Sequence, residues 1–108
     1  MFLTNLQAAS EWFEVLQTSE RSQTAVMNLA PGEKSGENAG AHHGSDQVLL
    51  VLEGELLAEI AEEKARLHRG DVVIVPAGVN HRFENPTSQP ARTFSVYAPP
   101  AYPAHTKG

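Results

Sequence analysis

Residues 70–85 read GDVVIVPAGVNHRFEN, and this stretch decides the fold. It starts with a Gly-Asp turn, continues with four apolar β-branched residues typical of a buried strand, and then reaches a Pro-Ala-Gly corner. Pro76 fixes its own φ angle, and Gly78 can take a backbone conformation that other residues avoid. We therefore expect the corner to place His81 at the start of a second strand with little freedom.

Short apolar segments separated by turn formers recur along the rest of the chain. The segments 23–29, 47–52 and 93–98 are rich in β-branched or large apolar residues, and glycine, proline, asparagine or aspartate stands between them. Short strands between regularly spaced turns are typical of a β-sandwich or a β-barrel. The sequence therefore predicts an all-β domain.

Region 55–67 contains residues that favour a helix, because Ala, Glu, Leu and Lys all have high helix propensity. Leu56, Ala58 and Ile60 nevertheless recur at every second position, as in a strand with one buried face. The acidic cluster at 61–64 can form the tip of a hairpin. We predict two strands here rather than a helix.

Length, charge and composition exclude several classes of protein. The chain has 108 residues, enough for one domain with a real core. Eight basic against thirteen acidic residues give a net charge of −5, which disfavours nucleic acid and membrane surfaces as partners. The absence of cysteine excludes disulfides and thiolate ligands. The first ten residues lack the pattern of a secretion signal, and no apolar run approaches the length of a membrane span, so we expect a cytoplasmic protein.

The segments 48–52 and 72–75 do not alternate polar with apolar residues, so we expect both faces of these strands to be covered. A small barrel alone would leave one face in water. Two alternatives can supply the cover. A second copy of the chain would give a homodimer, and an N-terminal segment carrying Trp12, Phe13 and Leu16 would fold over the same surface.

Candidate metal ligands stand on either side of a Gly44-Ser45 turn. His43 precedes the turn and Gln47 follows it, which is close enough for both side chains to converge on one point. His81 from the distant corner would complete a set of two imidazoles and one amide oxygen. Such donors suit iron, copper, nickel, manganese and zinc alike.

The chain resembles the small, one-barrel members of the cupin superfamily. The second cupin motif is a glycine, five residues, a proline, one residue, a glycine, two residues, a histidine, three residues and an asparagine. Every position of it is matched, by Gly70, Pro76, Gly78, His81 and Asn85. The first motif is matched at its last three landmarks by His43, Gln47 and Gly54, although Ala41 stands where a histidine belongs and Gln47 replaces a glutamate.

This resemblance implies a double-stranded β-helix, the cupin jelly-roll barrel, as one domain over residues 1–108. The core barrel would cover about 23–100, with segment 1–22 packing on or swapping onto it and 99–108 leaving as an extended tail. The resemblance also implies that His43, Gln47 and His81 line a site for a divalent first-row metal ion, with Fe, Mn, Ni and Zn not distinguished. The alanine at 41 and the neutral amide at 47 should both weaken metal binding.

The sequence leaves the role of His42 open. If Ala41 and His43 point into the barrel, strand alternation sends His42 outward, yet a loop at this turn can rotate it inward as a fourth ligand. Glu37 is another replacement, without support from its spacing. For the wall of a ligand pocket we expect four apolar residues, Leu49, Phe83, Phe94 and Tyr97. His68 and His105 lie outside both motifs and are expected on the surface.

Two functions fit these residues. The first is a metal-dependent enzyme, a dioxygenase-like oxidoreductase, an isomerase or a lyase, acting on a small organic molecule; this reaction range is what the resemblance implies. The second is a non-catalytic module that binds a small ligand or a metal ion at a degenerate site. The missing ligand at Ala41 and the uncharged Gln47 favour the second function, and the clustering of histidines favours the first.

Overall fold

The computed structural model describes residues 1–35, 42 and 44–107. These residues form one short 3-10 helix, η1 (Leu6–Ala8), and eight strands. The strands are β1 (Phe13–Thr18), β2 (Gln23–Leu29), β3 (Asp46–Glu53), β4 (Glu55–Ile60), β5 (Glu63–His68), β6 (Val72–Val75), β7 (His81–Glu84) and β8 (Ala91–Ala98). The all-β prediction is confirmed, and region 55–67 forms two strands as expected. In the described part of the chain no helix is long and apolar enough to cross a membrane.

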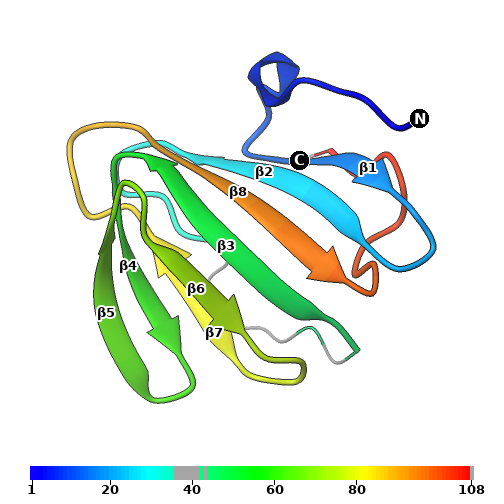
Figure 1. Cartoon of the computed structure of the whole chain (residues 1–108). Coiled ribbons are helices and arrows are strands. Elements are labelled where there is room, and N and C mark those ends of the chain that lie inside the picture. Colours follow the sequence, from blue (N-terminus) through cyan, green and yellow to red (C-terminus); the bar gives the residue numbers. More distant parts are fainter. Residues whose placement is uncertain (36–41, 43, 108) are drawn as a thin grey trace.

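The strands form two antiparallel sheets that face each other (Figure 1). The larger sheet has the order β1-β2-β8-β3-β6, and the smaller has the order β5-β4-β7. Strands that are distant in sequence are neighbours, since β8 lies between β2 and β3. This crossing order is that of a jelly roll, the predicted fold class.

The core lies between the inner faces of the two sheets. Gln47, Leu49 and Val51 of β3 point inward and are almost fully buried. Leu56 and Phe83 meet them from the smaller sheet, and both are at most 2% exposed. The alternation of buried and exposed positions along β3 follows from the two-residue period of a strand.

The outer face of β3 and β6 is apolar and uncovered within one chain. Val48, Val72 and Ile74 are 37%, 59% and 61% exposed. Val48 pairs with Ile74 across the two strands, so these side chains form a continuous patch. The expectation that both faces are covered is therefore not met by a single copy of the chain.

The N-terminal segment lies elsewhere, and the expectation that it folds over this patch is wrong. Arg92 of β8 donates hydrogen bonds to the carbonyl oxygens of Leu6 and Ala9, and Asn28 of β2 donates one to Glu11 O at 2.8 Å. Figure 1 accordingly shows η1 beside the β2 side of the larger sheet. The ring of Phe13 joins the core instead of the outer surface.

The last strand, β8, ends at Ala98, and the C-terminal segment after it folds back onto the molecule. Prolines 99 and 100 stop the ladder, as expected from the missing N–H donor. The chain then returns along β1, where Val15 N donates to Thr106 O at 2.8 Å and Glu14 forms a bridge with Lys107. The segment 99–107 is therefore a packed part of the structure and not a tail that leaves it.

Gly54 allows β3 to turn into β4 against the chain that enters β8. Its φ angle is +77°, and an added Cβ would lie 2.5 Å from the Pro90 carbonyl oxygen and 2.9 Å from the Ala91 Cα. We predict that Gly54→Ala lowers the free energy of unfolding by about 2–4 kcal/mol, because backbone strain adds to a steric clash.

The matched control is Gly32→Ala, which has a similar φ of +81° but no atom within 4 Å of the added Cβ. Strain alone should reduce its stability by about 1–2 kcal/mol. Urea denaturation measures both values. Equal losses in the two variants would contradict the close approach at Gly54.

Candidate functional site

A cavity of about 180 Å³ opens between the two sheets. Its apolar and aromatic wall consists of Trp12, Phe13, Met27, Phe83, Tyr97 and Tyr102. Its polar lining consists of Ser35, His42, Gln47, His81 and Thr106. Among the residues described, no Asp, Glu, Lys or Arg lines the cavity. It is therefore an aromatic pocket with a few neutral or weakly basic polar groups.

The Pro-Ala-Gly corner positions His81 as the sequence predicted. Val79 N donates to Pro76 O at 3.2 Å, which closes the turn just before β7. His81 Nδ1 lies 3.0 Å from Val79 O. Because a carbonyl oxygen only accepts hydrogen bonds, Nδ1 carries a proton in this contact, and Nε2 is the ring nitrogen that a ligand would use.

His42 lines the cavity. Its side chain therefore points inward, as expected for a loop residue, and not outward as strand alternation would place it. It lies before β3, where strand alternation does not apply. Gly78 N donates to His42 O at 2.9 Å, and the His42 and His81 ring centroids are 4.8 Å apart. Burial, and secondly the nearby His81, lower the pKa of His42 to about 4. The imidazole of His42 is therefore neutral at pH 7.

Gln47 brings an amide to the same cavity from β3. The residue is 4% exposed, and its Nε2 donates to Ser95 Oγ at 3.1 Å. Its Oε1 is buried and has no hydrogen-bond partner in the described part of the chain. A buried acceptor without a partner carries a free-energy penalty of about 1–3 kcal/mol, which a bound cation or a ligand donor would relieve.

Two tyrosines line the cavity beside His42. The ring centroids of Tyr97 and Tyr102 lie 5.0 Å and 5.4 Å from that of His42, and the Tyr102 hydroxyl is 3.5 Å from His42 Nε2. Burial raises the pKa of both phenols, so both are protonated at neutral pH. They offer hydroxyl groups, not phenolates, to a bound molecule.

The expected pocket residues are only partly brought together. Phe83 and Tyr97 line the cavity. Leu49 is fully buried in the core but is not in the wall. Phe94 occupies the opposite face of β8 from Tyr97, because three positions separate them and an odd spacing reverses the face of a strand. The expectation for Phe94 is therefore wrong.

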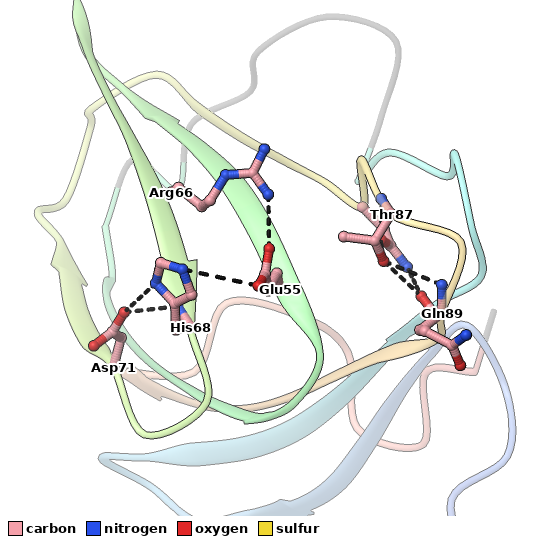
Figure 2. Close-up of polar contacts among 7 residues, drawn as sticks. Glu55, Arg66, His68, Asp71, Thr87 and Gln89 are labelled. Atoms are coloured by element: carbon pink, nitrogen blue, oxygen red, sulfur yellow. Dashed lines mark hydrogen bonds and ion pairs between the residues drawn. The ribbon is translucent and has the colours of Figure 1, made fainter.

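The predicted ligand His43 lies outside the described residues, as do Ala41 and Glu37. His68 and His105 are both exposed, as expected. Figure 2 shows the ring of His68 between two carboxylates, with nitrogen–oxygen distances of 3.9 Å to Glu55 and 3.7 Å to Asp71. His68 belongs to this surface cluster and not to the cavity.

Sequence reasoning missed the contributions of Trp12, Phe13 and Tyr102 to the cavity. The sequence suggested the outer surface for Trp12 and Phe13, and Tyr102 stands in a proline-rich end with no strand pattern. The only available signal was the presence of large aromatic residues in segments outside the barrel. Such residues are seldom left without packing partners.

The donors around the cavity partly fit a metal ion. In residues 1–35, 42 and 44–107 no three His, Cys, Asp or Glu side chains gather as a metal site. His42, His81 and Gln47 do supply two imidazoles and an amide oxygen around one cavity. Two imidazoles on one ion have ring centroids roughly 4.5–5 Å apart, since each nitrogen lies about 2.0–2.1 Å from the metal. The observed 4.8 Å agrees with this spacing.

The chain belongs to the cupin family, because the family model for the cupin domain matches residues 25–97. Its fold matches the crystal structure of BH2720 from Bacillus halodurans, with a TM-score of 0.88 and 26% identity over 98% of this chain and 86% of that one. TT1209 from Thermus thermophilus is similar, with a TM-score of 0.80 and 30% identity over 92% and 98% of the two chains. Members of this family commonly bind a divalent metal ion.

Among curated proteins the chain is 37% identical over 73 residues to the tetracenomycin polyketide synthase protein TcmJ of Streptomyces glaucescens, covering 68% of this chain. It is 30% identical over 86 residues to acireductone dioxygenase of Leishmania infantum, covering 67% of this chain. It spans 48% of the length of TcmJ and 25% of that of the dioxygenase. A sugar phosphate isomerase of the cupin superfamily from Silicibacter pomeroyi matches with a TM-score of 0.70 and 26% identity over 88% and 64% of the two chains.

Asn85, the last residue of the second motif, holds a turn together. Its side chain is fully buried, and its Nδ2 donates to Leu29 O at 3.0 Å and to Gln89 O at 2.7 Å. Its Oδ1 accepts from the N–H and the hydroxyl of Thr87. Figure 2 shows Thr87 beside Gln89 in this turn. The expectation that Asn85 turns the strand end is in keeping with these bonds.

We predict that Asn85→Ala lowers the free energy of unfolding by about 2–4 kcal/mol, because the buried Leu29 O loses its side-chain donor and Thr87 loses the acceptor that holds the turn. Gln89→Ala is the matched control, since Gln89 contributes only backbone atoms to these bonds. That variant should change stability by less than about 0.5 kcal/mol. Urea unfolding followed by circular dichroism gives both values, and a neutral Asn85→Ala would disprove this role.

Proposed function

We propose that this protein is a small cupin metalloenzyme that holds one divalent first-row metal ion in the cavity and acts on a small organic molecule. The observation that carries the proposal is that Gln47, whose buried Oε1 has no hydrogen-bond partner among the described residues, lines the same cavity as His42 and His81. His81 would bind through Nε2, and His42 would supply the second described imidazole. His43, matched by the motif, completes the proposed ligand set.

The residues of this chain perform the positioning in such a site. The Val79 carbonyl fixes the orientation of the His81 ring, as outer groups commonly do for metal-binding histidines. Ser95 accepts a hydrogen bond from the Gln47 Nε2, which fixes the orientation of the amide. A bound ion would supply Lewis acidity, and Fe(II) would add redox chemistry with dioxygen. The aromatic wall would exclude water from the reacting molecule.

The reaction is proposed as that of a dioxygenase-like oxidoreductase, an isomerase or a lyase. Relatives named as an acireductone dioxygenase and a sugar phosphate isomerase support the first two classes. A non-catalytic module that binds a small ligand or a metal ion is the alternative. The neutral Gln47 and the alanine at 41 favour this alternative, because a site without a carboxylate attracts a dication less strongly.

We also propose that the protein is a homodimer and is located in the cytoplasm. Val48, Val72 and Ile74 form an apolar patch on the outer face of the larger sheet, next to its β6 edge. A symmetric interface brings the same patch of two chains together and removes it from water.

Metal content tests the cofactor. Protein purified without chelator should contain close to one first-row metal ion per chain by elemental analysis, and His81→Ala should lose it. Gln47→Glu should bind the metal about tenfold more tightly or better in competition with a chelating dye, because the carboxylate adds a negative charge.

His68→Ala is the control, since His68 is exposed and away from the cavity. It should keep the metal content of the unmodified protein. A low metal content that neither His81→Ala nor Gln47→Glu alters would remove the cofactor from the proposal. Oxygen uptake with a panel of enols, phenols and keto acids then separates the enzyme from the binding module.

The dimer is tested by light scattering at micromolar concentration. The unmodified protein should have twice the mass of one chain, and the double variant Val72→Glu, Ile74→Glu should be a monomer, because two buried carboxylates per chain would lack partners. Leu57→Glu, at a residue that is 37% exposed on the smaller sheet, should remain a dimer. A monomeric mass for the unmodified protein would refute the interface.

A further inference from the structure

The C-terminal segment carries one wall of the cavity, and one buried side chain fastens the part that bears Tyr102. Gln23, at the start of β2, is 1% exposed. Its Oε1 accepts hydrogen bonds from Ala101 N at 3.1 Å and Tyr102 N at 3.0 Å, and its Nε2 donates to Tyr102 O at 2.8 Å and Thr18 Oγ1 at 2.9 Å. Every donor and acceptor of this amide is used. Gln23 therefore clamps the backbone of Tyr102.

The clamp presents Tyr102 to the cavity in one orientation. The Tyr102 ring packs against Phe13 with a centroid distance of 4.7 Å and meets Tyr97 edge-on at 5.2 Å. Its hydroxyl reaches His42 Nε2 only at 3.5 Å, which is long for a hydrogen bond. The Tyr102 hydroxyl also interacts with the side chain of Tyr97, so the two phenols form one polar edge of the cavity.

The charge and shape of the cavity limit what it can bind. Among the described lining residues none is Lys or Arg, so a phosphate or another dianion would find no side-chain countercharge. The wall is mostly aromatic, and flat rings pack well against such side chains. The volume of about 180 Å³ is somewhat larger than an engineered cavity of about 150 Å³ that binds benzene.

The polar groups of the cavity favour a ligand that carries a hydrogen-bond donor. Within the described part of the chain Gln47 Oε1 is a buried acceptor without a partner, so a ligand that donates a hydrogen bond would satisfy it in the metal-free protein. A ring with one hydroxyl group combines the flat apolar body and the donor that the cavity lacks.

We propose that the cavity selects an uncharged, single-ring molecule with a hydroxyl group, such as a phenol or a cyclic enol, and that Tyr102, clamped by Gln23, is the specificity-determining residue. This inference rests on the proposed function for the location of the site, but it does not require a metal. It disfavours a sugar phosphate as the ligand of this protein.

The test is calorimetric titration of the full-length protein, as purified and after chelator treatment, with three probes. p-Cresol has the ring and the hydroxyl, phenyl phosphate replaces the hydroxyl with a dianion, and cyclohexanol has the hydroxyl without a flat ring. Trp12 is the only tryptophan of the chain and lines the cavity, so its fluorescence should report the same binding. p-Cresol should bind about tenfold more tightly or better than either other probe.

Substitutions at Tyr102 and Gln23 test which residues determine the preference for p-cresol. Tyr102→Ala should weaken p-cresol binding about tenfold, and Tyr102→Phe should weaken it less, because the ring wall remains. Gln23→Leu should resemble Tyr102→Ala, since it releases the same wall, while His68→Ala should bind like the unmodified protein. If the buried Gln23→Leu variant does not fold, the two Tyr102 variants carry the test.

Tighter binding of phenyl phosphate to the chelator-treated protein, an unchanged affinity in Tyr102→Ala, or no p-cresol binding to either preparation would overturn the inference. Metal content is measured on the same samples. If p-cresol binds to a protein that never holds metal, the proposed metalloenzyme is refuted and this inference stands. If the protein holds one metal ion per chain but does not prefer p-cresol to the other probes, the metal site stands and this inference is refuted.

Discussion

One backbone hydrogen bond connects the two parts of the chain on which the site depends. Gly78 N donates to His42 O at 2.9 Å, so the Pro-Ala-Gly corner before β7 is fastened to the turn that precedes β3. The donor reaches this acceptor because Gly78 takes a φ of +79°, which other residues adopt only with strain. Asp46 adds a second tie through its carboxylate, which accepts from Ala77 N at 2.9 Å. The two histidine rings meet at 4.8 Å because their backbones are joined in this way.

The fold was largely predictable because its signals are local and regular. Alternation along 55–60 identified β4 against a contrary helix propensity, since the requirement to bury one face of a strand outweighs a few tenths of a kcal/mol per residue. Among the described residues, Gly32, Gly54, Gly70 and Gly78 lie outside the strands and have positive φ angles, as expected of turn residues. The destinations of the two terminal segments were not predictable, because side chains distant in sequence fix them. Arg92 and Asn28 anchor the N-terminal segment, and Gln23 anchors the C-terminal one.

The candidate site was predictable in part for the same reason. His81 and Gln47 lie on strands at motif positions, so their inward direction follows from alternation. His42 lies outside the strands, where the period of two gives no answer, and a backbone bond to the corner decides its position. The same period within β8 places Phe94 on the face opposite Tyr97, which contradicts the prediction of a shared wall. The metal ligands themselves stay a prediction, with His43 outside the described residues.

Gln47 stands where the cupin motif has a glutamate, and this replacement affects both the affinity for a metal ion and the kind of substrate that the cavity can hold. A glutamate at this position would attract a dication but would also repel an anionic substrate and resist burial in an aromatic cavity. The uncharged amide weakens all three of these effects. Burial also keeps His42 neutral, so Gln47 and His42 offer no full charge to a metal ion or to an anionic substrate. A site of this kind gains its selectivity from shape and from single hydrogen bonds. In the proposed site, the wall that Gln23 holds through Tyr102 would contribute to recognition together with the histidines, because a flat molecule would have to fit between them.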